Sequence, residues 1–509
     1  MTGRGQMEMI RIRGGATLSG SVSVSGSKNA SLPILAACLL IDGPVILDGV
    51  PHLRDVDSML QLLENLGVAW TRQADDSLLL EVQDDHEVRA PYHLVRTMRA
   101  SFCLLGPLWA KRGRAIVSYP GGCVFGHRPV DLHLKGLGAI GAQLELGDGH
   151  VHATGRVQGG NVFLGGNFGS TVLGTANVVM AAVLGSGETI IDAAAQEPEV
   201  ADLCHFLNAC GADIRGIGSH RLVVRGVDAL HGCRYRIIPD RIEAGTLLCA
   251  GVITRGEVEV LGARPEDLSA FLDRLRAAGV SLELGTRELP INRRTDDGLR
   301  ELDVNAAPRI RPAAKGAGKA RTGDLVAGDL DERQGSLMAD RVALPGSSGA
   351  ADSEGEAGDG GGVATEHVPF IRTLPWDRLD AVDVATLPYP GFPTDLQAQI
   401  LATMCIAEGV SVITEKVYPE RFIHCAELAR LGAKIHREGP TAIVHGQRRL
   451  RGAAMMASDL RASAALVLAG LVAEGRSEVR RVYHLDRGYE ALDRKLARLG
   501  ADVERATES

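Results

Sequence analysis

The fold is decided by a short stretch, Ile140-Gly141-Ala142-Gln143-Leu144-Glu145-Leu146, in which an amphipathic helix ends at a glycine and an alternating strand follows. A glycine just past a helix C-terminus suits the positive φ that this position favours. The residues after it alternate between polar and apolar, as in a half-buried strand. The same pattern recurs five more times in the chain, around Gly67, Gly211, Gly279, Gly432 and Gly500.

These six glycines define an internal repeat. Successive glycines lie 74, 70, 68, 153 and 68 residues apart, which indicates a unit of about 70 residues and one long interval. A second pattern occurs once per unit: a helix of small and apolar residues with a polar group in its first turn. Its copies begin at Lys28, Arg99, Thr171, Arg241, Asp395 and Arg461.

Each unit is predicted to run strand, apolar helix, strand, amphipathic helix, strand. Helices that are apolar all round are typical of a buried position. Six such units predict an α/β protein of two domains with three units each. This agrees with the length of 509 residues, which is too long for one ordinary core.

The long interval predicts a disordered insertion at 286–369. This stretch contains no Phe, Trp or Tyr and is rich in Gly and charged residues, so it cannot bury enough apolar surface to offset its ordering entropy. A short strand near Leu302-Asp303-Val304 is the one element expected within it. Both a tolerated loop expansion and a partner-binding segment fit this composition, and the first is favoured.

Composition excludes several classes of protein. A net charge of −8 without a long basic stretch argues against nucleic acid as a partner. The longest apolar runs fall short of the roughly 20 residues that span a bilayer, and the N-terminus lacks an apolar signal region. Nine cysteines, several of them in apolar helices, suit reduced thiols. A cytoplasmic protein without a membrane segment is expected.

Four of the six apolar helices begin with a cation, namely Lys28, Arg99, Arg241 and Arg461. A cation there works against the helix dipole, so an anionic ligand held by both the cation and the free N–H groups is one explanation. A solvated charge or an ordinary ion pair is the alternative for any one of them. Together they indicate phosphate-bearing substrates without identifying which.

The loop Tyr119-Pro120-Gly121-Gly122-Cys123-Val124-Phe125-Gly126-His127-Arg128-Pro129 holds a cysteine between glycines and close to basic residues. We expect this loop to be mobile and the Cys123 thiol to be reactive. A small apolar residue filling a loop pocket is the alternative. No His/Cys cluster has metal-ligand spacing, and neither a phosphate-binding P-loop nor a dinucleotide fingerprint occurs.

Eight segments together resemble the enolpyruvyl transferases that act on UDP-N-acetylglucosamine, and they run through almost the whole chain outside the insertion. These segments are Gly26-Ser27-Lys28-Asn29-Ala30, Thr97-Met98-Arg99-Ala100-Ser101, Pro120-Gly121-Gly122-Cys123, Arg128-Pro129-Val130-Asp131-Leu132-His133, Pro239-Asp240-Arg241-Ile242-Glu243, Phe392-Pro393-Thr394-Asp395-Leu396-Gln397-Ala398-Gln399, Asp459-Leu460-Arg461-Ala462-Ser463 and His484-Leu485-Asp486-Arg487-Gly488-Tyr489-Glu490.

The resemblance implies an inside-out α/β barrel in two domains, one of residues 28–238 and one of residues 1–27 plus 239–509. It also implies a reaction. The 3′-hydroxyl of the UDP-sugar adds to phosphoenolpyruvate, and phosphate leaves from a tetrahedral intermediate, in the first committed step towards peptidoglycan. The two small molecules are the expected partners, with no cofactor and no obligate protein partner.

The resemblance also implies roles for individual residues. Cys123 would donate a proton to the methylene carbon, and Asp395 would accept the proton of the attacking hydroxyl. Lys28, also assigned to the catalytic group, and Asn29 would hold phosphoenolpyruvate. Arg99 and Arg128 would bind the phosphate of phosphoenolpyruvate or the nucleotide phosphates, and Arg421 and Arg487 would bind the carboxylate side of phosphoenolpyruvate. The UDP-sugar would be contacted by Arg128, Pro129, Val130, Asp131, Leu132 and Val417.

Two positions depart from the pattern of the family. Leu173 stands where a glycine of a diphosphate-binding stretch is expected, and Tyr389 stands where a histidine is expected. Two alternatives remain open. One is the sister reaction on shikimate 3-phosphate, against which the cysteine-bearing loop argues. The other is a non-catalytic protein that binds the UDP-sugar, against which the presence of Lys28, Cys123 and Asp395 argues.

Overall fold

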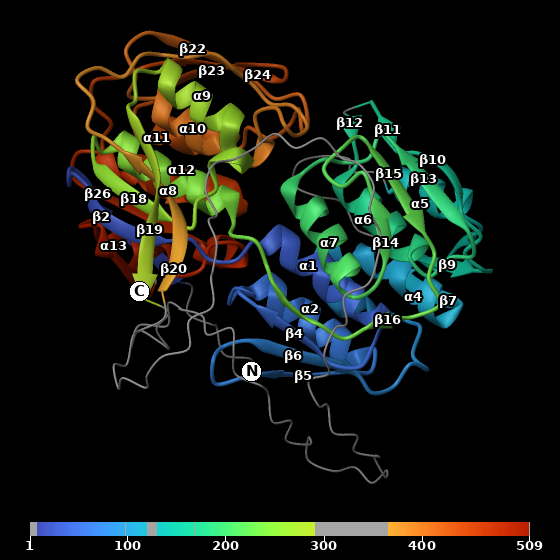
Figure 1. Ribbon diagram of the computed structural model, residues 1–509. Coiled ribbons are helices and arrows are strands. Elements are labelled where there is room, and N and C mark those ends of the chain that lie inside the picture. The colour runs from blue at the N-terminus through green and yellow to red at the C-terminus, as the bar shows by residue number, and fades with distance from the viewer. Residues whose placement is uncertain (1–7, 97, 120–129, 168, 291–364, 508–509) are drawn as a thin grey trace, which may run out of the picture.

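The computed structural model describes residues 8–96, 98–119, 130–167, 169–290 and 365–507 (Figure 1). Of the sequence-based predictions, the loop residues Cys123, Arg128 and Pro129, the strand near Leu302-Asp303-Val304 and most of the insertion lie outside these ranges. None of the described helices is both long and apolar enough to cross a bilayer.

The six apolar helices begin within one residue of their predicted starts, and most of their residues are buried. Two of them open with a turn of 3₁₀ helix. They are α1 (Lys28–Ala37), η2 (Arg99–Leu104) with α4 (Leu105–Arg112), α6 (Val172–Ala182), α8 (Arg241–Ile253), η4 (Thr394–Leu396) with α10 (Gln397–Met404), and α12 (Leu460–Val472).

Each of the six amphipathic helices ends two residues before a glycine, as predicted, and the residue between them is Leu, Ile, Cys or Ala. These glycines have φ values of 83°, 108°, 102°, 88°, 90° and 95° in chain order, the left-handed region in which a side chain is strained. The helices are α2 (Arg54–Asn65), α5 (Asp131–Ala139), α7 (Pro198–Ala209), α9 (Ser269–Ala277), α11 (His424–Arg430) and α13 (Leu492–Arg498).

Six sheets share one pairing pattern, in which a parallel pair is followed by two antiparallel pairs. In β7-β9-β8 a single parallel bridge from Arg89 to Ile116 takes the place of the first strand. The other five sheets are β17-β4-β6-β5, β10-β13-β15-β14, β2-β18-β20-β19, β21-β22-β24-β23 and β25-β26-β1-β27.

The strands of these sheets are β1 (Glu8–Arg13), β2 (Ser19–Ser23), β4 (Val45–Asp48), β5 (Val68–Arg72), β6 (Leu78–Val82), β7 (Arg114–Ser118), β8 (Gln143–Gly147), β9 (His150–Thr154), β10 (Gly160–Phe163), β13 (Glu188–Asp192), β14 (Asp213–Arg215), β15 (Arg221–Arg225), β17 (Arg234–Arg236), β18 (Glu257–Leu261), β19 (Leu282–Pro290), β20 (Thr365–Thr373), β21 (Val384–Ala385), β22 (Val410–Thr414), β23 (Lys434–Glu438), β24 (Thr441–His445), β25 (Ala454–Met456), β26 (Arg476–Arg480) and β27 (Asp502–Thr507).

The predicted unit was one strand short, because the strand after each glycine has an antiparallel partner that the prediction missed. This partner is the next strand along the chain in five units, and for β27 it is the N-terminal strand β1. In β8–β9 the connection is Asp148-Gly149, whose φ values are 51° and 73°. Positive φ at both central residues is the requirement of a type I′ turn, for which Asp-Gly is a favoured sequence. This dipeptide was therefore an available signal for the missing strand.

The remaining described elements are short. They are η1 (Cys38–Leu40), β3 (Ile41–Asp42), α3 (Tyr92–Val95), β11 (Gly165–Gly166), β12 (Gly169–Ser170), β16 (Leu230–His231), η3 (Pro265–Leu268) and η5 (Val482–Arg487).

The insertion was predicted too wide at both ends. Strands β19 and β20 pair without interruption from Leu282↔Thr373 to Pro290↔Thr365, so residues 286–290 and 365–369 form a regular antiparallel ladder. The alternation of this ladder is obscured in the sequence by Gly, Pro and charged residues. The stretch between Pro290 and Thr365 lies outside the described residues.

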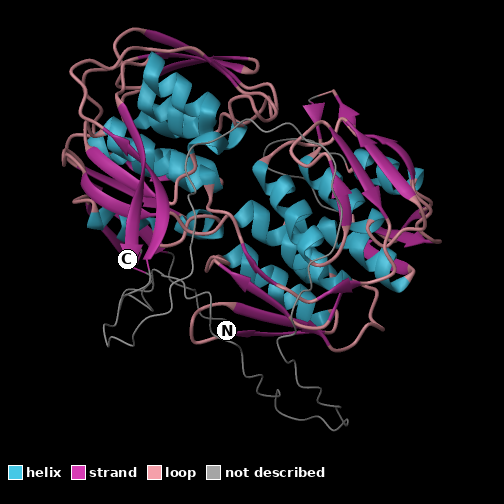
Figure 2. Cartoon of the chain, in the orientation of Figure 1, coloured by secondary structure: helices cyan, strands magenta, loops and turns pink. Residues whose placement is uncertain are grey.

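Two separate hydrophobic cores lie side by side (Figures 1 and 2). The first core, here the first half, draws its residues from Ala30 to Ile237. The second core, here the second half, draws its residues from Ile10 to Val22 and from Ile242 to Ala501. In both halves the helices lie inside and the strands lie around them (Figure 2). The α/β class is confirmed, whereas the barrel arrangement and the domain boundaries stay predictions.

The chain passes between the halves at two adjacent segments, around Gly26 and Pro239, which form a bridge. Ser27 donates its N–H to Ile238 O at 2.7 Å, and Asp240 donates its N–H to Ser25 O at 2.9 Å. A Cβ at Gly26 would lie 1.7 Å from Gly49 O, so only glycine fits there. The two crossing segments therefore support each other, and they lead directly into α1 and α8.

Candidate functional site

Lys28 opens α1 immediately after the first crossing segment. The Ser27 hydroxyl caps this helix by accepting from Ala30 N at 3.3 Å, which is the usual role of serine at an N-cap. The Lys28 ammonium lies 3.4 Å from Asp55 Oδ2, in the first turn of α2, and both side chains are buried. Asp55 Oδ1 also accepts from Arg487 Nε at 2.8 Å. One carboxylate therefore joins cations from both halves.

Asp395 lies in η4, facing the start of α1. Its Oδ1 is 2.7 Å from Arg421 Nη1, and its Oδ2 is 2.9 Å from Arg461 Nη2. Asn29 Nδ2 reaches Oδ2 from the first half at 3.5 Å. The Asp395 side chain is still 26% exposed, whereas those of Arg421 and Arg461 are 7% and 2% exposed. The Asp395 side chain is thus partly exposed, unlike those of its two arginine partners.

The charges of this cluster are shifted by burial and by each other. Burial would raise the pKa of Asp395, but the guanidiniums of Arg461 and Arg421 outweigh it and hold the pKa well below its usual range. Burial lowers the pKa of the Lys28 ammonium, and Asp55 opposes that shift. Asp395 is consequently an ionised carboxylate at neutral pH, in the form that can accept a proton.

Further residues hold the cluster in place. Glu415 accepts from the hydroxyl of Thr394 at 2.8 Å and from the backbone N–H of Val417 at 2.9 Å. Thr394 in turn accepts from Arg421 Nη1 at 3.0 Å. Val417, predicted as a substrate contact, is therefore linked to Asp395 through buried Glu415, two residues before it.

Two aspartates cap the helices that carry the cations. Asp459 accepts from Arg461 N at 2.9 Å and from Ala462 N at 3.0 Å. Asp240 caps α8 in the same way, and its other oxygen accepts from Lys28 N at 3.2 Å. Such carboxylates satisfy N–H groups that a helix leaves free and offset the helix dipole.

Arg241 forms an ordinary ion pair, which was the alternative to ligand binding for each cation at a helix start. Its Nε and Nη2 lie 2.9 and 3.2 Å from the two oxygens of Glu199, in a buried bidentate pair between the halves. The ring of Tyr389 lies against the guanidinium, 5.7 Å from ring centroid to Cζ. Tyr389, where histidine was expected, thus packs at the junction of the two halves.

The other predicted contacts lie elsewhere in the first half. Arg99 opens η2 and lies near His133, whose pKa is lowered to about 3 by burial and by the charge of Arg99. Val130 and Asp131 begin α5, and Leu132 would meet a Cβ placed on Gly166 at 3.0 Å. The structure brings together Lys28, Asn29, Asp395, Arg421 and Arg487; the cluster as defined here does not include Arg99 or residues 130–132.

Comparison with known proteins identifies the family. The model of the family described as EPSP synthase (3-phosphoshikimate 1-carboxyvinyltransferase) matches residues 12–342 and 360–496. A UDP-N-acetylglucosamine 1-carboxyvinyltransferase from Coxiella burnetii (strain Dugway 5J108-111) is 42% identical, over 98% of this chain and 96% of its own. A protein with the same name from Dichelobacter nodosus (strain VCS1703A) is 41% identical, over 99% and 100%. The chain belongs to the enolpyruvyl (1-carboxyvinyl) transferase family.

Solved structures agree in fold. The enolpyruvyl transferase NikO from Streptomyces tendae has a TM-score of 0.75 at 22% identity and covers 99% of this chain and 100% of its own. An EPSP synthase from Acinetobacter baumannii has a TM-score of 0.65 at 15% identity, over 98% and 100%. This enolpyruvyl transferase is therefore an enzyme of the transferase class with the α/β fold of its family.

Two members of the cluster were missing from the predicted site of this transferase. Arg461 was named among the helix-start cations that indicate an anionic ligand, but it was not assigned to the site, although it occupies the same repeat position as Lys28. Asp55 gave no such signal, because an acidic residue in a first helical turn is favourable on its own. Only the packing of η5 against α2 shows that Asp55 bridges Lys28 and Arg487.

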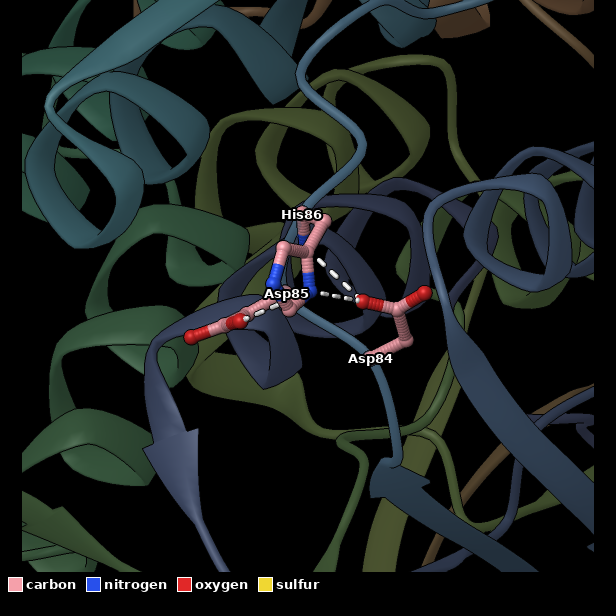
Figure 3. A group of neighbouring side chains, drawn as sticks. All are labelled: Asp84, Asp85 and His86. Carbon is pink, nitrogen blue, oxygen red and sulfur yellow. Dashed lines mark hydrogen bonds and ion pairs between the residues drawn. The ribbon is translucent and has the colours of Figure 1, made fainter. Parts of the chain in front are cut away.

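A second charged group of the transferase, Asp84, Asp85 and His86, is shown in Figure 3. His86 Nδ1 lies 2.6 Å from Asp84 Oδ1 and 3.6 Å from Asp85 Oδ1, and all three residues are exposed. Among the described residues these are the only three His, Cys, Asp or Glu side chains close enough to share a metal ion. Neighbours in sequence on an open surface commonly approach in this way, and we assign the group no role.

Proposed function

We propose that this transferase moves the enolpyruvyl group of phosphoenolpyruvate to the 3′-hydroxyl of UDP-N-acetylglucosamine and releases phosphate. The observation that carries the proposal is the Asp395 cluster, in which an ionised, partly open carboxylate is surrounded by buried cations. The named relatives, 41–42% identical over almost the whole chain, support the choice of acceptor.

Charge explains why an anionic substrate fits this place. Four cations, Lys28, Arg421, Arg461 and Arg487, pair directly with the carboxylates of Asp55 and Asp395. Three of them, Lys28, Arg421 and Arg461, are largely buried, and in such a setting an anion gains more from a cation than it would in water. Lys28 and Arg487 are the residues that we assign to the phosphate and carboxylate groups of phosphoenolpyruvate, with Asn29 beside them.

In the proposed mechanism Asp395 accepts the proton of the sugar hydroxyl as that oxygen attacks the central carbon of phosphoenolpyruvate. Cys123 donates a proton to the methylene carbon, and phosphate then leaves the tetrahedral intermediate. A carboxylate held by two guanidiniums is a weak base. We therefore infer that a substrate anion draws Arg421 or Arg461 towards itself, which raises the pKa of Asp395 when a base is needed.

The remaining assignments belong to the same proposal. Arg99, Arg128 and residues 129–132 contact the UDP-sugar, with Val417 on the other side. Residues 28–238 and residues 1–27 plus 239–509 form two domains, each an inside-out barrel of three units, and the substrates bind between them. The reaction serves peptidoglycan precursor synthesis in the cytoplasm, without a cofactor and without an obligate protein partner.

The test is phosphate release from phosphoenolpyruvate with either UDP-N-acetylglucosamine or shikimate 3-phosphate as the acceptor. Release only with the UDP-sugar is expected. Release only with shikimate 3-phosphate would show that the proposed acceptor is wrong. This acceptor is the necessary comparison because the matching family model is described as a 3-phosphoshikimate 1-carboxyvinyltransferase. Release with neither, from folded protein that binds the UDP-sugar, would refute catalysis and favour a binding protein.

The role of Cys123 is tested separately. We expect Cys123→Ser to lose nearly all turnover while it still binds the sugar nucleotide, because a hydroxyl is a far weaker acid than a thiol at this step. An epoxide analogue of phosphoenolpyruvate should alkylate Cys123, as detected by mass spectrometry of the treated protein. Undiminished turnover of Cys123→Ser would remove Cys123 from the mechanism.

A further inference from the structure

Two thiols away from the candidate site lie close together in the first half. Cys210 follows the last turn of α7, and Cys233 immediately precedes β17. Their Sγ atoms are 3.3 Å apart. A disulfide has an S–S distance of about 2.05 Å, so the two sulfurs need to approach by little more than about 1 Å.

The backbone holds these two thiols side by side. Cys210 O accepts from His231 N at 2.8 Å, two residues before Cys233. Cys233 O accepts from Ile46 N at 2.9 Å, next to the parallel pairing of β17 with β4. Cys210 N is itself bonded to Phe206 O at 3.0 Å as α7 ends. The contact thus depends on regular secondary structure on both sides.

The two thiols are not equivalent. Cys210 is buried, whereas Cys233 is partly exposed and within reach of small solutes. The hydrogen bond between the two thiols lowers the pKa of Cys233, although burial opposes the shift, and the same bond raises the pKa of Cys210. By contrast, burial raises the pKa of Cys204, on the same helix, to about 12. A more acidic, accessible thiol beside a buried one is the arrangement of an attacking and a resolving cysteine.

We propose that Cys210 and Cys233 form a redox-active dithiol that hydrogen peroxide oxidises to a disulfide. The Cys233 thiolate attacks one peroxide oxygen, the O–O bond breaks, and Cys233 becomes a sulfenic acid while one water is formed. Cys210 sulfur then attacks Cys233 sulfur, an S–S bond forms, and a second water leaves with the remaining thiol proton. The two sulfurs are oxidised, the peroxide is reduced, and a dithiol reductant reverses the change by exchange.

The disulfide would act as a staple. It closes a loop between positions 23 apart in sequence and ties the end of α7 to the strand that leads into the second crossing segment. A cross-link of this kind stabilises mainly by restricting the unfolded chain. The oxidised protein should therefore unfold at a higher temperature than the reduced protein.

The test uses full-length Cys123→Ser protein, so that the predicted reactive loop thiol does not take part. The protein is treated with hydrogen peroxide, alkylated, digested without reduction and examined by mass spectrometry. The expected product is one cross-linked peptide pair joining Cys210 to Cys233, lighter by two hydrogens than the two thiol peptides. Its formation should accompany a rise in Tm that dithiothreitol abolishes.

The controls are serine variants in the same background. Cys210→Ser should leave a sulfenic acid at Cys233 that a dimedone probe labels, whereas Cys204→Ser should still form the Cys210–Cys233 bond. The Cys123→Ser parent alone suffices if a variant fails to fold. Three outcomes would overturn the proposal: a bond from Cys233 to Cys38, a sulfinic acid on Cys233 with Cys210 still reduced, or both thiols unchanged under peroxide that oxidises exposed Met456.

Discussion

Two groups of ion pairs lie next to the crossing segments, and they differ in what surrounds them. Lys495 Nζ lies 2.5 Å from Glu243 Oε1 and donates to Ser25 Oγ at 2.8 Å, and neither charged side chain is more than 1% exposed. Asp395, in contrast, has a side chain that is 26% exposed, and it pairs with two guanidiniums at once. The closed group is fully buried, whereas the open group combines a partly exposed carboxylate side chain with two buried cations.

The comparison shows how a structural ion pair can be told from a ligand site. Ser25 N donates to Glu243 Oε2 at 2.6 Å, so the Lys495–Glu243 pair also fixes the backbone of the first crossing segment. Its charges satisfy each other and two groups of Ser25. The arginines at Asp395 are held in position by a carboxylate whose side chain is partly exposed. We therefore assign a role in stability to the Lys495–Glu243 group and a role in catalysis to the Asp395 group.

The largest predicted effect on stability is at the closed group. Lys495→Met should lower the free energy of unfolding by about 3–5 kcal/mol, because it leaves the buried Glu243 carboxylate without its cation. Chemical denaturation followed by circular dichroism measures this loss. The double variant Glu243→Leu/Lys495→Met should recover most of it, since paired replacement by apolar residues is often close to neutral. A single variant as stable as wild type would contradict the assignment.

A smaller, pH-dependent effect is expected at the open group. The pKa of Asp395 in the folded protein lies well below the unfolded value of about 3.9, so its stabilising contribution is present above that value and is lost as the pH falls through the folded pKa. Asp395→Asn should be less stable than wild type at pH 7, by less than Lys495→Met because water reaches the site. The difference should shrink below about pH 4. Urea unfolding from pH 7 to pH 3 checks this, and a constant difference would count against the paired carboxylate.

The smallest effect is predicted for removal of residues 291–364. Pro290 and Thr365 are paired neighbours at the end of β19 and β20, so an Asn-Gly turn can join them. Activity and Tm of this deletion should match those of wild type, because both ion-pair groups are untouched. A deletion that removes half of the segment and leaves the rest of the connection in place serves as the matched control. An inactive but folded deletion would give the segment a role in function.

Much of the fold could be predicted from the sequence because the signals that begin and end its helices lie within a few residues of each other. The helix that ends before Gly141 and the helix that starts at Lys28 are set by local glycine and apolar patterns, and both lie where predicted. The second strand of each hairpin was missed, although Asp148-Gly149 carried the turn signal. The ends of the insertion were misplaced because the β19–β20 ladder continues through residues with weak alternation.

The site could be predicted only in part, since its members come from distant stretches. Lys28 and Asp395 were named from the repeat and the family resemblance, and the structure places both in one cluster of charged side chains. Asp55 was missed because its role depends on Arg487, 432 positions away in sequence. The pairing of Arg241 with Glu199 could not be predicted either, because the residues around each of them give no indication of its partner.

The most direct measurement is the initial rate of phosphate release at saturating phosphoenolpyruvate and UDP-N-acetylglucosamine, per folded molecule, for Asp395→Asn and for Glu243→Leu/Lys495→Met. The account predicts that Asp395→Asn loses about 10²–10⁴ in rate, the usual contribution of a general base, whereas the double variant keeps the wild-type rate. Equal losses in both variants, or an undiminished rate in Asp395→Asn, would contradict the division between an open catalytic group and a closed structural one.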